Sequence, residues 1–352
     1  MSTRKKSLLP LIMLTLVAVV LSACQEEDPR DLADEPYERT EFLLGTVANI
    51  RVYNEGKEEA MDKAFEHIAD LDRRFAMQNP DSEISEINRQ AGIAPVEVSE
   101  EVFLVMETAL YYAEESDGGF DPTIGAVTDL WKIGQPEAAV PNQEELDAAL
   151  EVVDYRLVEL NEEDQTVYLP KEGMMLDLGA IAKGYITDEA ARILIEEGVN
   201  TAIVDLGGDI VVVGNSTRGD DEPWNVGIQN PYGERGEIIG LVPVSDDAIV
   251  TSGIYERVVE QDGEEYHHLI DPETGFPFDN NIAGLSVIAD DALTADALSS
   301  VAFALGVEEG LAYFDTLEGA EVIFVTRDYE ILASEGIRDA VQINDDDFKK
   351  ID

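Results

Sequence analysis

The chain has 352 residues, of which 45% are hydrophobic and 7% aromatic; this excludes a disordered protein and allows one large domain or two closely joined ones. Its 76 acidic residues outnumber 23 basic ones, and the formal net charge of -53 argues against nucleic-acid binding. Cys24 is the only cysteine, so an internal disulfide and a thiolate metal site are excluded, and oxygen ligands for a hard cation such as Mg2+ are favoured.

The N-terminus is typical of an exported lipoprotein. Three cations at positions 4–6 precede an apolar run over residues 8–21 and the tetrapeptide Leu21-Ser22-Ala23-Cys24. This order predicts a cleaved signal over residues 1–23, and the tetrapeptide resembles a bacterial lipobox, in which Cys24 becomes the lipid-bearing first residue. The alternative is a membrane-anchoring helix, but about 14 apolar residues are too few to span a bilayer comfortably. Cleavage would remove three cations and no acids, leaving 20 basic against 76 acidic residues, a charge of -56.

Residues 24–40 are polar, acidic and contain proline, which predicts a tether between the lipidated cysteine and a domain over residues 41–345. A charged tail is expected over residues 346–352. Within the domain, alternation predicts a strand from Phe42 to Tyr53 that is broken at Gly45, and helical spacing predicts helices over residues 61–75 and 102–113. Asn142 and Glu145 form a capping-box pattern that opens another short helix.

The second half mixes strands and helices without a regular rhythm. Helical spacing from residue 181 ends at Gly198, and two strands are expected around Gly207-Gly208. Later strands are expected over residues 285–289 and 322–326, with a helix between them from Thr294, its expected N-cap, to Gly306, its expected end. This pattern predicts an α+β fold of mixed sheets with packed helices, and not a Rossmann fold.

A first phosphate-binding pattern lies at residues 176–185, Leu-Asp-Leu-Gly-Ala-Ile-Ala-Lys-Gly-Tyr, where a strand turns into a helix. Gly179 is expected near the helix N-terminus, whose free N–H groups and dipole attract a phosphate. Lys183, one turn in, adds a point charge. The alternatives are a solvated helix face for Lys183 and a helix cap for Asp177.

A metal-binding pair is predicted in the segment Thr294-Ala-Asp-Ala-Leu-Ser-Ser300, where Asp296 and Ser300 share one helix face at i, i+4. A carboxylate and a hydroxyl so placed can bind one Mg2+. The alternative is that Asp296 simply occupies the first turn of a helix, where the dipole favours it.

Two further segments suit a flavin and a proton acceptor. Gly119, Phe120 and Trp131 could wall a planar ring, the alternative being turn and core residues. His268 precedes an Asp271-Pro272 turn and is a candidate general base, although a lone histidine is usually structural.

Taken in order, these phrases resemble the FAD:protein FMN transferase family, also called the ApbE or thiamine-biosynthesis lipoprotein family, from about Phe42 to Arg338. The resemblance implies an ApbE-like, T-fold-related domain and an extracytoplasmic, Mg2+-dependent enzyme that transfers FMN from FAD to a threonine or serine hydroxyl of a partner protein, releasing AMP. The motifs that carry it are Leu44-Gly45-Thr46, Asp81-Ser82-Glu83-Ile84-Ser85, Gly119-Phe120-Asp121-Pro122-Thr123, Asp177 to Tyr185, Leu206-Gly207-Gly208-Asp209, Thr251-Ser252-Gly253, His268 to Gly275, and Ala295-Asp296.

The same resemblance implies roles for individual residues. Mg2+ would be held by the backbone carbonyl of Ala180 with Asp296 and Ser300, the last being commonly threonine in the family. His268 would accept the proton of the acceptor hydroxyl. Methionine is frequent at the position of Leu44, and an aromatic residue can occur at that of Gln78. The implied FAD pocket consists of Leu44, Gln78, Gly119, Phe120, Asp121, Asp177, Lys183 and Ile270.

Two other functions are compatible with these residues. One is an FAD pyrophosphatase, in which water replaces the acceptor hydroxyl and FMN and AMP are released. The other is a lipoprotein that binds flavin for uptake without turnover. For a transferase, the resemblance suggests an exported acceptor such as a flavin-carrying subunit of a membrane redox pump. The enzyme would be extracytoplasmic and anchored to the bacterial membrane, inner or outer, by lipid on Cys24.

Overall fold

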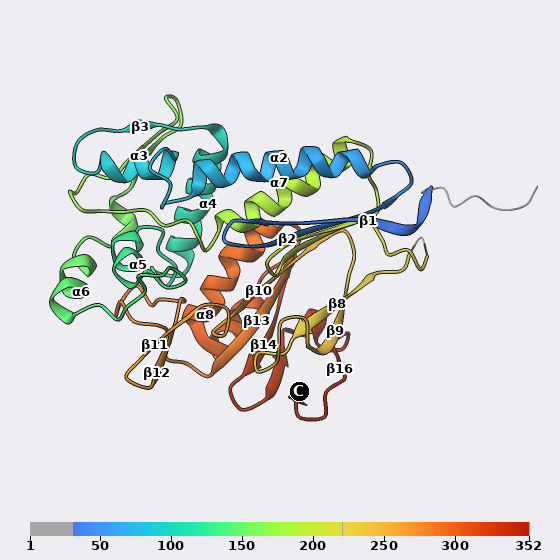
Figure 1. Cartoon of the computed structure of the whole chain (residues 1–352). Helices are drawn as coiled ribbons and strands as arrows, with labels where there is room; N and C mark the ends of the chain where they lie inside the picture. The colour runs from blue at the N-terminus through green and yellow to red at the C-terminus, as the bar shows by residue number, and fades with distance from the viewer. Residues whose placement is uncertain (1–30, 220, 352) are drawn as a thin grey trace, which may run out of the picture.

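The computed structural model describes residues 31–219 and 221–351, and a nine-stranded sheet forms its centre (Figure 1). The strand order is β1-β2-β6-β7-β10-β13-β14-β15-β17, and neighbouring strands are antiparallel except β15 and β17. A sheet that is almost wholly antiparallel is incompatible with a Rossmann fold, so the α+β prediction is confirmed. The strands are β1 (Leu32–Leu43), β2 (Thr46–Asn54), β6 (Ala202–Leu206), β7 (Asp209–Val213), β10 (Ala248–Gly253), β13 (Ile282–Ala289), β14 (Ala320–Thr326), β15 (Glu330–Ala333) and β17 (Lys349–Lys350).

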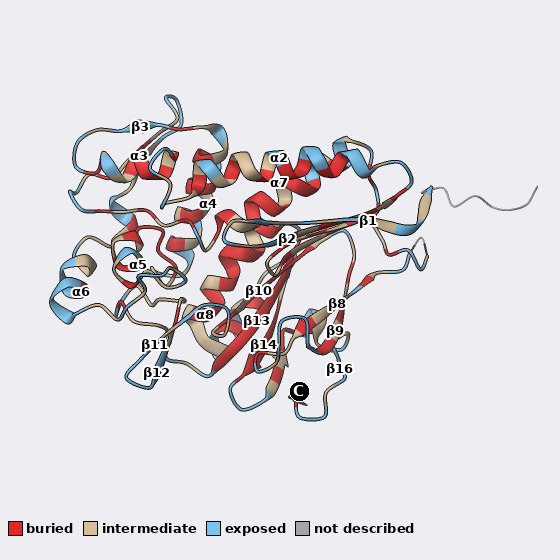
Figure 2. Cartoon of the chain, viewed as in Figure 1, coloured by how far each residue is buried: buried red, intermediate tan, exposed pale blue. Residues whose placement is uncertain are grey.

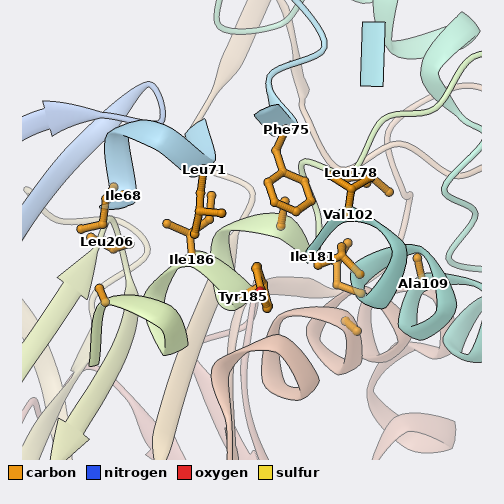
Figure 3. Close-up of a cluster of buried hydrophobic side chains, with 14 of the residues drawn as sticks. Ile68, Leu71, Phe75, Val102, Ala109, Leu178, Ile181, Tyr185, Ile186 and Leu206 are labelled. Carbon is orange, nitrogen blue, oxygen red and sulfur yellow. The ribbon is translucent and has the colours of Figure 1, made fainter. Parts of the chain in front are cut away.

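Three helices cover one face of this sheet: α2 (Glu58–Phe75), α7 (Ala182–Glu196) and α8 (Ala292–Phe314). Apolar residues at helical spacing make one side of α2 fit against α7, and Figure 3 shows Ile68, Leu71 and Phe75 above Tyr185 and Ile186. The rings of Phe75 and Tyr185 lie 6.0 Å apart. Burial of these side chains, at roughly 1.5–3 kcal/mol each, fixes α7 over the sheet.

The opposite face of the sheet packs against a small sheet of three strands, β8 (Trp224–Gln229), β9 (Ile238–Val244) and β16 (Gln342–Ile343). Because both of its faces are covered, β13 is buried at every residue (Figure 2). The helix α8 is long and apolar enough to cross a membrane by length and composition. Its residues Leu298, Val301 and Phe303 are buried in the protein's cores, as expected for a core helix.

A second, mostly helical part lies beside one end of the sheet (Figure 1). Trp131 is buried there against the partly buried Tyr266 and Phe276, and its indole N–H donates to the carbonyl of Gly275 at 2.7 Å. These contacts join this part to the β11–β12 hairpin. Its elements are α3 (Glu83–Arg89), β3 (Val96–Glu97), α4 (Glu100–Glu115), α5 (Gly125–Trp131), α6 (Gln143–Leu150), the 3-10 turn Tyr155–Leu157, β4 (Glu159–Asn161) and β5 (Thr166–Tyr168), and the hairpin is β11 (Val258–Gln261) and β12 (Glu264–His267).

The structure corrects two boundaries of the predicted domain. Residues 32–40, assigned to the tether, form most of β1, and within the predicted tail Lys349–Lys350 form β17. Both are edge strands, with one side open to solvent, so their composition is as polar as that of a linker. The predicted signal over residues 1–23 and Cys24 lie outside the described residues.

The structure also corrects both ends of the helix expected from Thr294 to Gly306. Asp291 is the N-cap, and its carboxylate accepts the backbone N–H of Thr294 at 2.7 Å. At Gly306 the backbone leaves helical geometry, with φ of 76°, but the helix resumes and continues to Phe314. Gly306 therefore kinks the helix and does not end it, because residues beyond it, such as Gly310, still pack on Phe324.

Candidate functional site

Several chain reversals meet at one end of the large sheet. Three segments lie at this end of the sheet because their strands are antiparallel neighbours: the β1–β2 turn at Leu44-Gly45, the β6–β7 turn at Gly207-Gly208 and the end of β10. Gly207, with φ of +71°, lies so close to Thr46 that a Cβ atom would overlap its side chain. Glycines in these turns keep side chains small at this end of the sheet, where the first turn of α7 also lies.

The centre of the site is a buried cluster of one cation and two carboxylates. Lys183, in the first turn of α7, forms an ion pair with Asp209, the first residue of β7. Asp296, in the first turns of α8, accepts the backbone N–H of Gly184 through Oδ2 at 3.0 Å. The Asp209 side chain is 0% exposed, and its Oδ2 atom has no hydrogen-bond partner. Two buried carboxylates therefore share one lysine.

Burial and the neighbouring charges shift the pKa values of all three groups. Burial raises the pKa of Asp209 well above its usual value, the neighbouring Asp296 carboxylate raises it further, and Lys183 opposes both effects. Burial likewise raises the pKa of Asp296. Burial alone would lower the pKa of Lys183, but the two carboxylates outweigh it and the pKa is raised. The cluster thus has more anionic groups than Lys183 can neutralise, which favours an additional proton or a metal cation.

Close packing of α7 on α8 sets the position of Asp296. A Cβ atom at Gly184 would overlap the carbonyl oxygen of Ala292 and lie 2.8 Å from the Asp296 Cβ atom. The Asp188 carboxylate of α7 accepts the N–H groups of Ala292 and Leu293, both at 2.8 Å. Burial raises the pKa of Asp188 to about 7. These contacts hold the two helices together at the point where the cluster forms.

His268 and Arg257 lie next to the cluster. The backbone N–H of His268 donates to the carbonyl of Arg257 at 3.2 Å, and the buried Nδ1 atom of His268 has no hydrogen-bond partner. Burial lowers the pKa of His268 to about 3, with further contributions from the charge of Arg257 and from His267. The imidazole is therefore neutral at physiological pH, as a proton acceptor must be.

Leu44 adopts a backbone conformation that is rare for its residue type. It joins Leu43 to the β2 strand with φ of +56°, and Gly45 follows with φ of +67°. Such two-residue hairpin turns favour asparagine or glycine, so a leucine costs conformational energy here. Its N–H donates to Asp72 at 3.3 Å. A partly buried apolar side chain held at the edge of the site, in spite of this cost, suits contact with a ring.

Two predicted FAD residues hold the loops of the site in place. Asp177 accepts the N–H of Gly179 at 2.9 Å and the hydroxyl of Thr128 at 2.7 Å. Asp121 accepts the N–H and hydroxyl of Thr123 and the N–H of Tyr155. Burial raises the pKa of Asp121. Both carboxylates are thus engaged by the protein's own donors.

The other predicted pocket residues have different surroundings. The Phe120 side chain is buried in the main core, and Gly119 packs closely against Ala304. Ile270 packs beside the Trp131 cluster, and Gln78 is exposed in the loop after α2. In the described part of the chain, none of the four forms a hydrogen bond or ion pair with the Lys183, Asp209 and Asp296 side chains.

The residues predicted to hold Mg2+ offer a mixed set of oxygen donors. Ser300 is partly exposed one turn beyond Asp296, whereas the adjacent Ser299 hydroxyl is engaged by Ser252 at 3.0 Å and by the Asp296 carbonyl at 2.7 Å. Ala180 is partly buried in the turn before α7. Over the described ranges, no three His, Cys, Asp or Glu side chains form a metal-binding group. A cation here would need hydroxyl and carbonyl ligands beside the carboxylates.

Sequence reasoning gave no role to Asp209 or Arg257. Asp209 opens the strand Asp-Ile-Val-Val-Val, and a carboxylate at the start of such an apolar run is a signal that it is buried and needs a partner. Arg257 carried no comparable signal, because it lies in an ordinary exposed turn.

Comparison with known proteins identifies relatives of this chain. The model of the ApbE family matches residues 44–324, a range that contains every residue of the cluster. The FAD:protein FMN transferase of Treponema pallidum is 38% identical over 327 residues, covering 89% of this chain and 90% of the relative. A protein of the same name from Klebsiella pneumoniae is 34% identical, covering 85% and 92%.

Solved structures with a similar fold are also known. The ApbE protein from Thermotoga maritima superposes with a TM-score of 0.79 at 33% identity, covering 86% of this chain and 98% of that one. The flavin transferase ApbE from Vibrio cholerae superposes with a TM-score of 0.75 at 27% identity, covering 87% and 99%. With a family model matching most of its length and a relative of 38% identity, the chain belongs to the ApbE family.

Proposed function

We propose that the protein is an FAD:protein FMN transferase, which moves FMN from FAD to a threonine or serine hydroxyl of an acceptor protein and releases AMP. The observation that carries this proposal is the buried cluster of Lys183, Asp209 and Asp296 at the first turn of α7, within a domain of the ApbE family. A helix N-terminus with a lysine suits a diphosphate, and the surplus carboxylate suits a metal cation.

The reaction is a phosphoryl transfer that depends on positioning and charge. The acceptor oxygen forms a bond to the phosphorus of the FMN half, and the bond from that phosphorus to the bridging oxygen breaks, so AMP leaves with the electron pair. Lys183 offsets negative charge on the diphosphate. His268 takes the hydroxyl proton at its ring nitrogen. Burial, with a further contribution from the charge of Arg257, lowers its pKa to about 3, whereas a negative diphosphate bound nearby would raise it.

We further propose that the site uses Mg2+, held by Asp296, the Ser300 hydroxyl and the Ala180 carbonyl. The cation would neutralise charge on the diphosphate oxygens during transfer. Two buried carboxylates with raised pKa values against one lysine, and a partnerless Oδ2 on Asp209, support a cation at this place. Since metal ligands must be deprotonated, binding would displace the proton that the cluster otherwise retains.

The proposed location is extracytoplasmic, with lipid on Cys24 anchoring the protein to a bacterial membrane. Only residues 25–31 separate Cys24 from the first strand, which begins at Leu32. A fully extended segment of this length reaches about 25 Å. The acceptor would therefore be an exported protein that comes close to the membrane, such as a flavin-carrying subunit of a redox pump.

The test uses the chain from residue 25 onward, FAD and Mg2+, added to membranes from source cells that lack this gene. Flavin fluorescence retained on a protein band after denaturing electrophoresis, together with equimolar AMP, is the expected result. The Lys183→Met variant is the control for adventitious labelling. Stoichiometric FMN and AMP without labelled protein would instead establish a pyrophosphatase. Bound but intact FAD would establish a flavin-binding protein.

A further inference from the structure

Arg257 is a cation without an anionic partner in a chain rich in acids. Several arginines of the protein pair with carboxylates, for example Arg39 with Asp62, Arg156 with Asp117 and Arg192 with Glu196, whereas Arg235 and Arg327 form no ion pair among the described residues. In the described part of the chain, the Arg257 guanidinium forms no ion pair and donates no hydrogen bond, although acidic residues number 76 in the sequence. Its charge is therefore uncompensated.

Two glycines hold the Arg257 side chain at the edge of the site. A Cβ atom at Gly134 would lie 3.1 Å from Arg257 Cδ, and one at Gly45 would lie 3.6 Å from Arg257 Nη2. Both glycines have positive φ, +88° and +67°, so their conformations as well as their size disfavour a side chain there. The arginine thus runs along the loop after α5 and ends at the β1–β2 turn, beside Leu44.

The same arginine acts on the two residues proposed to handle the phosphate. Its carbonyl accepts the N–H of His268 at 3.2 Å. Its positive charge adds to the effect of burial in lowering the pKa of His268, and it opposes the raised pKa of Lys183. Lys183, however, already has the Asp209 carboxylate beside it. Of the two cations, Arg257 is the one whose charge remains to meet a ligand.

We propose that Arg257 is a second phosphate-binding cation of the site and donates hydrogen bonds to the diphosphate of FAD. This inference rests on the proposed function. The diphosphate carries two negative charges, and the planar fork of a guanidinium matches phosphate oxygens better than the edge of a flavin or adenine ring.

The test compares Arg257→Gln with Lys349→Gln, at fixed free Mg2+. Lys349 is an exposed cation of the edge strand β17, four strands beyond β10, so its variant has the same change in net charge far from the site. Binding of FAD and riboflavin is measured by flavin fluorescence. Binding of ADP is measured by its competition with FAD. Loss of a charge-assisted hydrogen bond should weaken FAD and ADP about 10- to 100-fold in Arg257→Gln. Riboflavin, which lacks phosphate, should bind within about twofold of wild type.

Two results would overturn the inference. Equal weakening of riboflavin and FAD would make Arg257 a residue that shapes the pocket, and equal weakening by Lys349→Gln would make the effect one of net charge. Melting curves of both variants report whether they fold, and Arg257→Lys retains the charge if glutamine is not tolerated. Binding is measured without an acceptor protein, so it tests the Arg257 contact independently of FMN transfer. A protein that binds FAD but transfers no FMN would refute the proposed function without affecting this test.

Discussion

Replacing Lys183 by methionine should destabilise the protein strongly, because it leaves Asp209 and Asp296 buried without their cation. The Lys183 side chain is 23% exposed and that of Asp209 0%, so solvent cannot replace the lost partner at Asp209. Breaking a buried ion pair by removing one partner costs about 3–5 kcal/mol. Because the pKa of Asp209 is already well raised, this carboxylate can take up a proton, and we expect about 3 kcal/mol at pH 7.

The double variant Lys183→Met/Asp209→Asn separates the ion pair from other effects. With both charges removed, neither residue is left as an unpaired buried ion, so the loss of unfolding free energy should be smaller than the sum of the two single losses by about 2 kcal/mol. Urea denaturation of the wild type, the two single variants and the double variant gives this coupling free energy directly. The double variant should regain stability and remain inactive in FMN transfer.

The pH dependence gives a second check on the same cluster. Without Lys183, the folded-state pKa values of both carboxylates should rise further above their unfolded values. Groups with raised folded pKa values contribute stability that is fully present below their unfolded pKa, near 4, and is lost as pH rises through the folded pKa. The loss of unfolding free energy in Lys183→Met should therefore be larger at pH 8 than at pH 5. A deficit independent of pH, or additive losses in the double variant, would refute an ionic cluster.

Three further expectations follow from the contacts of the site. Gly184→Ala should cost about 1–3 kcal/mol in denaturation and abolish FMN transfer, because the new methyl group overlaps the carbonyl of Ala292 and pushes α8 from α7; wild-type stability would contradict this packing. Leu44→Asn should raise the unfolding free energy by about 0.5–1 kcal/mol through its positive φ, yet weaken FAD binding by titration. Mg2+ affinity, measured by calorimetry, should fall as pH falls, because the raised pKa values of Asp209 and Asp296 favour their protonated forms; affinity that is flat with pH would place the metal elsewhere.

The spacing of apolar residues in the sequence was sufficient to predict a helix or strand where one face of that element is buried. The spacing of Met61, Phe65, Ile68 and Leu71 predicts a helix because α2 packs one side on α7. The same reasoning failed at β1, which lies at the sheet edge. Its burial is only partial, and half-buried and exposed residues alternate only from Tyr37 onward, after a register shift between Leu32 and Tyr37.

The site was predictable only in part, for a different reason. The N-terminus of α7 and its lysine are local features, so Lys183 can be predicted from one short phrase. Its partners depend on tertiary packing: the contact with Asp209 spans 26 residues, and that between Gly184 and Asp296 spans 112. No spacing rule connects such residues. Asp296 was a candidate through its i, i+4 spacing with Ser300 and through the resemblance to a family, whereas Asp209 and Arg257 became candidates only when their surroundings were known.

The charge of the whole chain predicts an unusual response to salt. FAD brings two negative charges to a protein with a formal charge of -53, so distant acidic residues should oppose its approach at low ionic strength. The Debye length falls from about 10 Å in 0.1 M salt to about 3 Å in 1 M salt, which screens the distant repulsion. The Lys183 ion pair and the proposed Arg257 contact act at hydrogen-bond distance, where screening is weaker. FAD affinity and melting temperature, measured across this range at fixed free Mg2+, should therefore both rise with NaCl. A steady fall in both would mean that short-range ion pairs dominate the electrostatics of this protein, and would count against long-range repulsion as the term that salt removes.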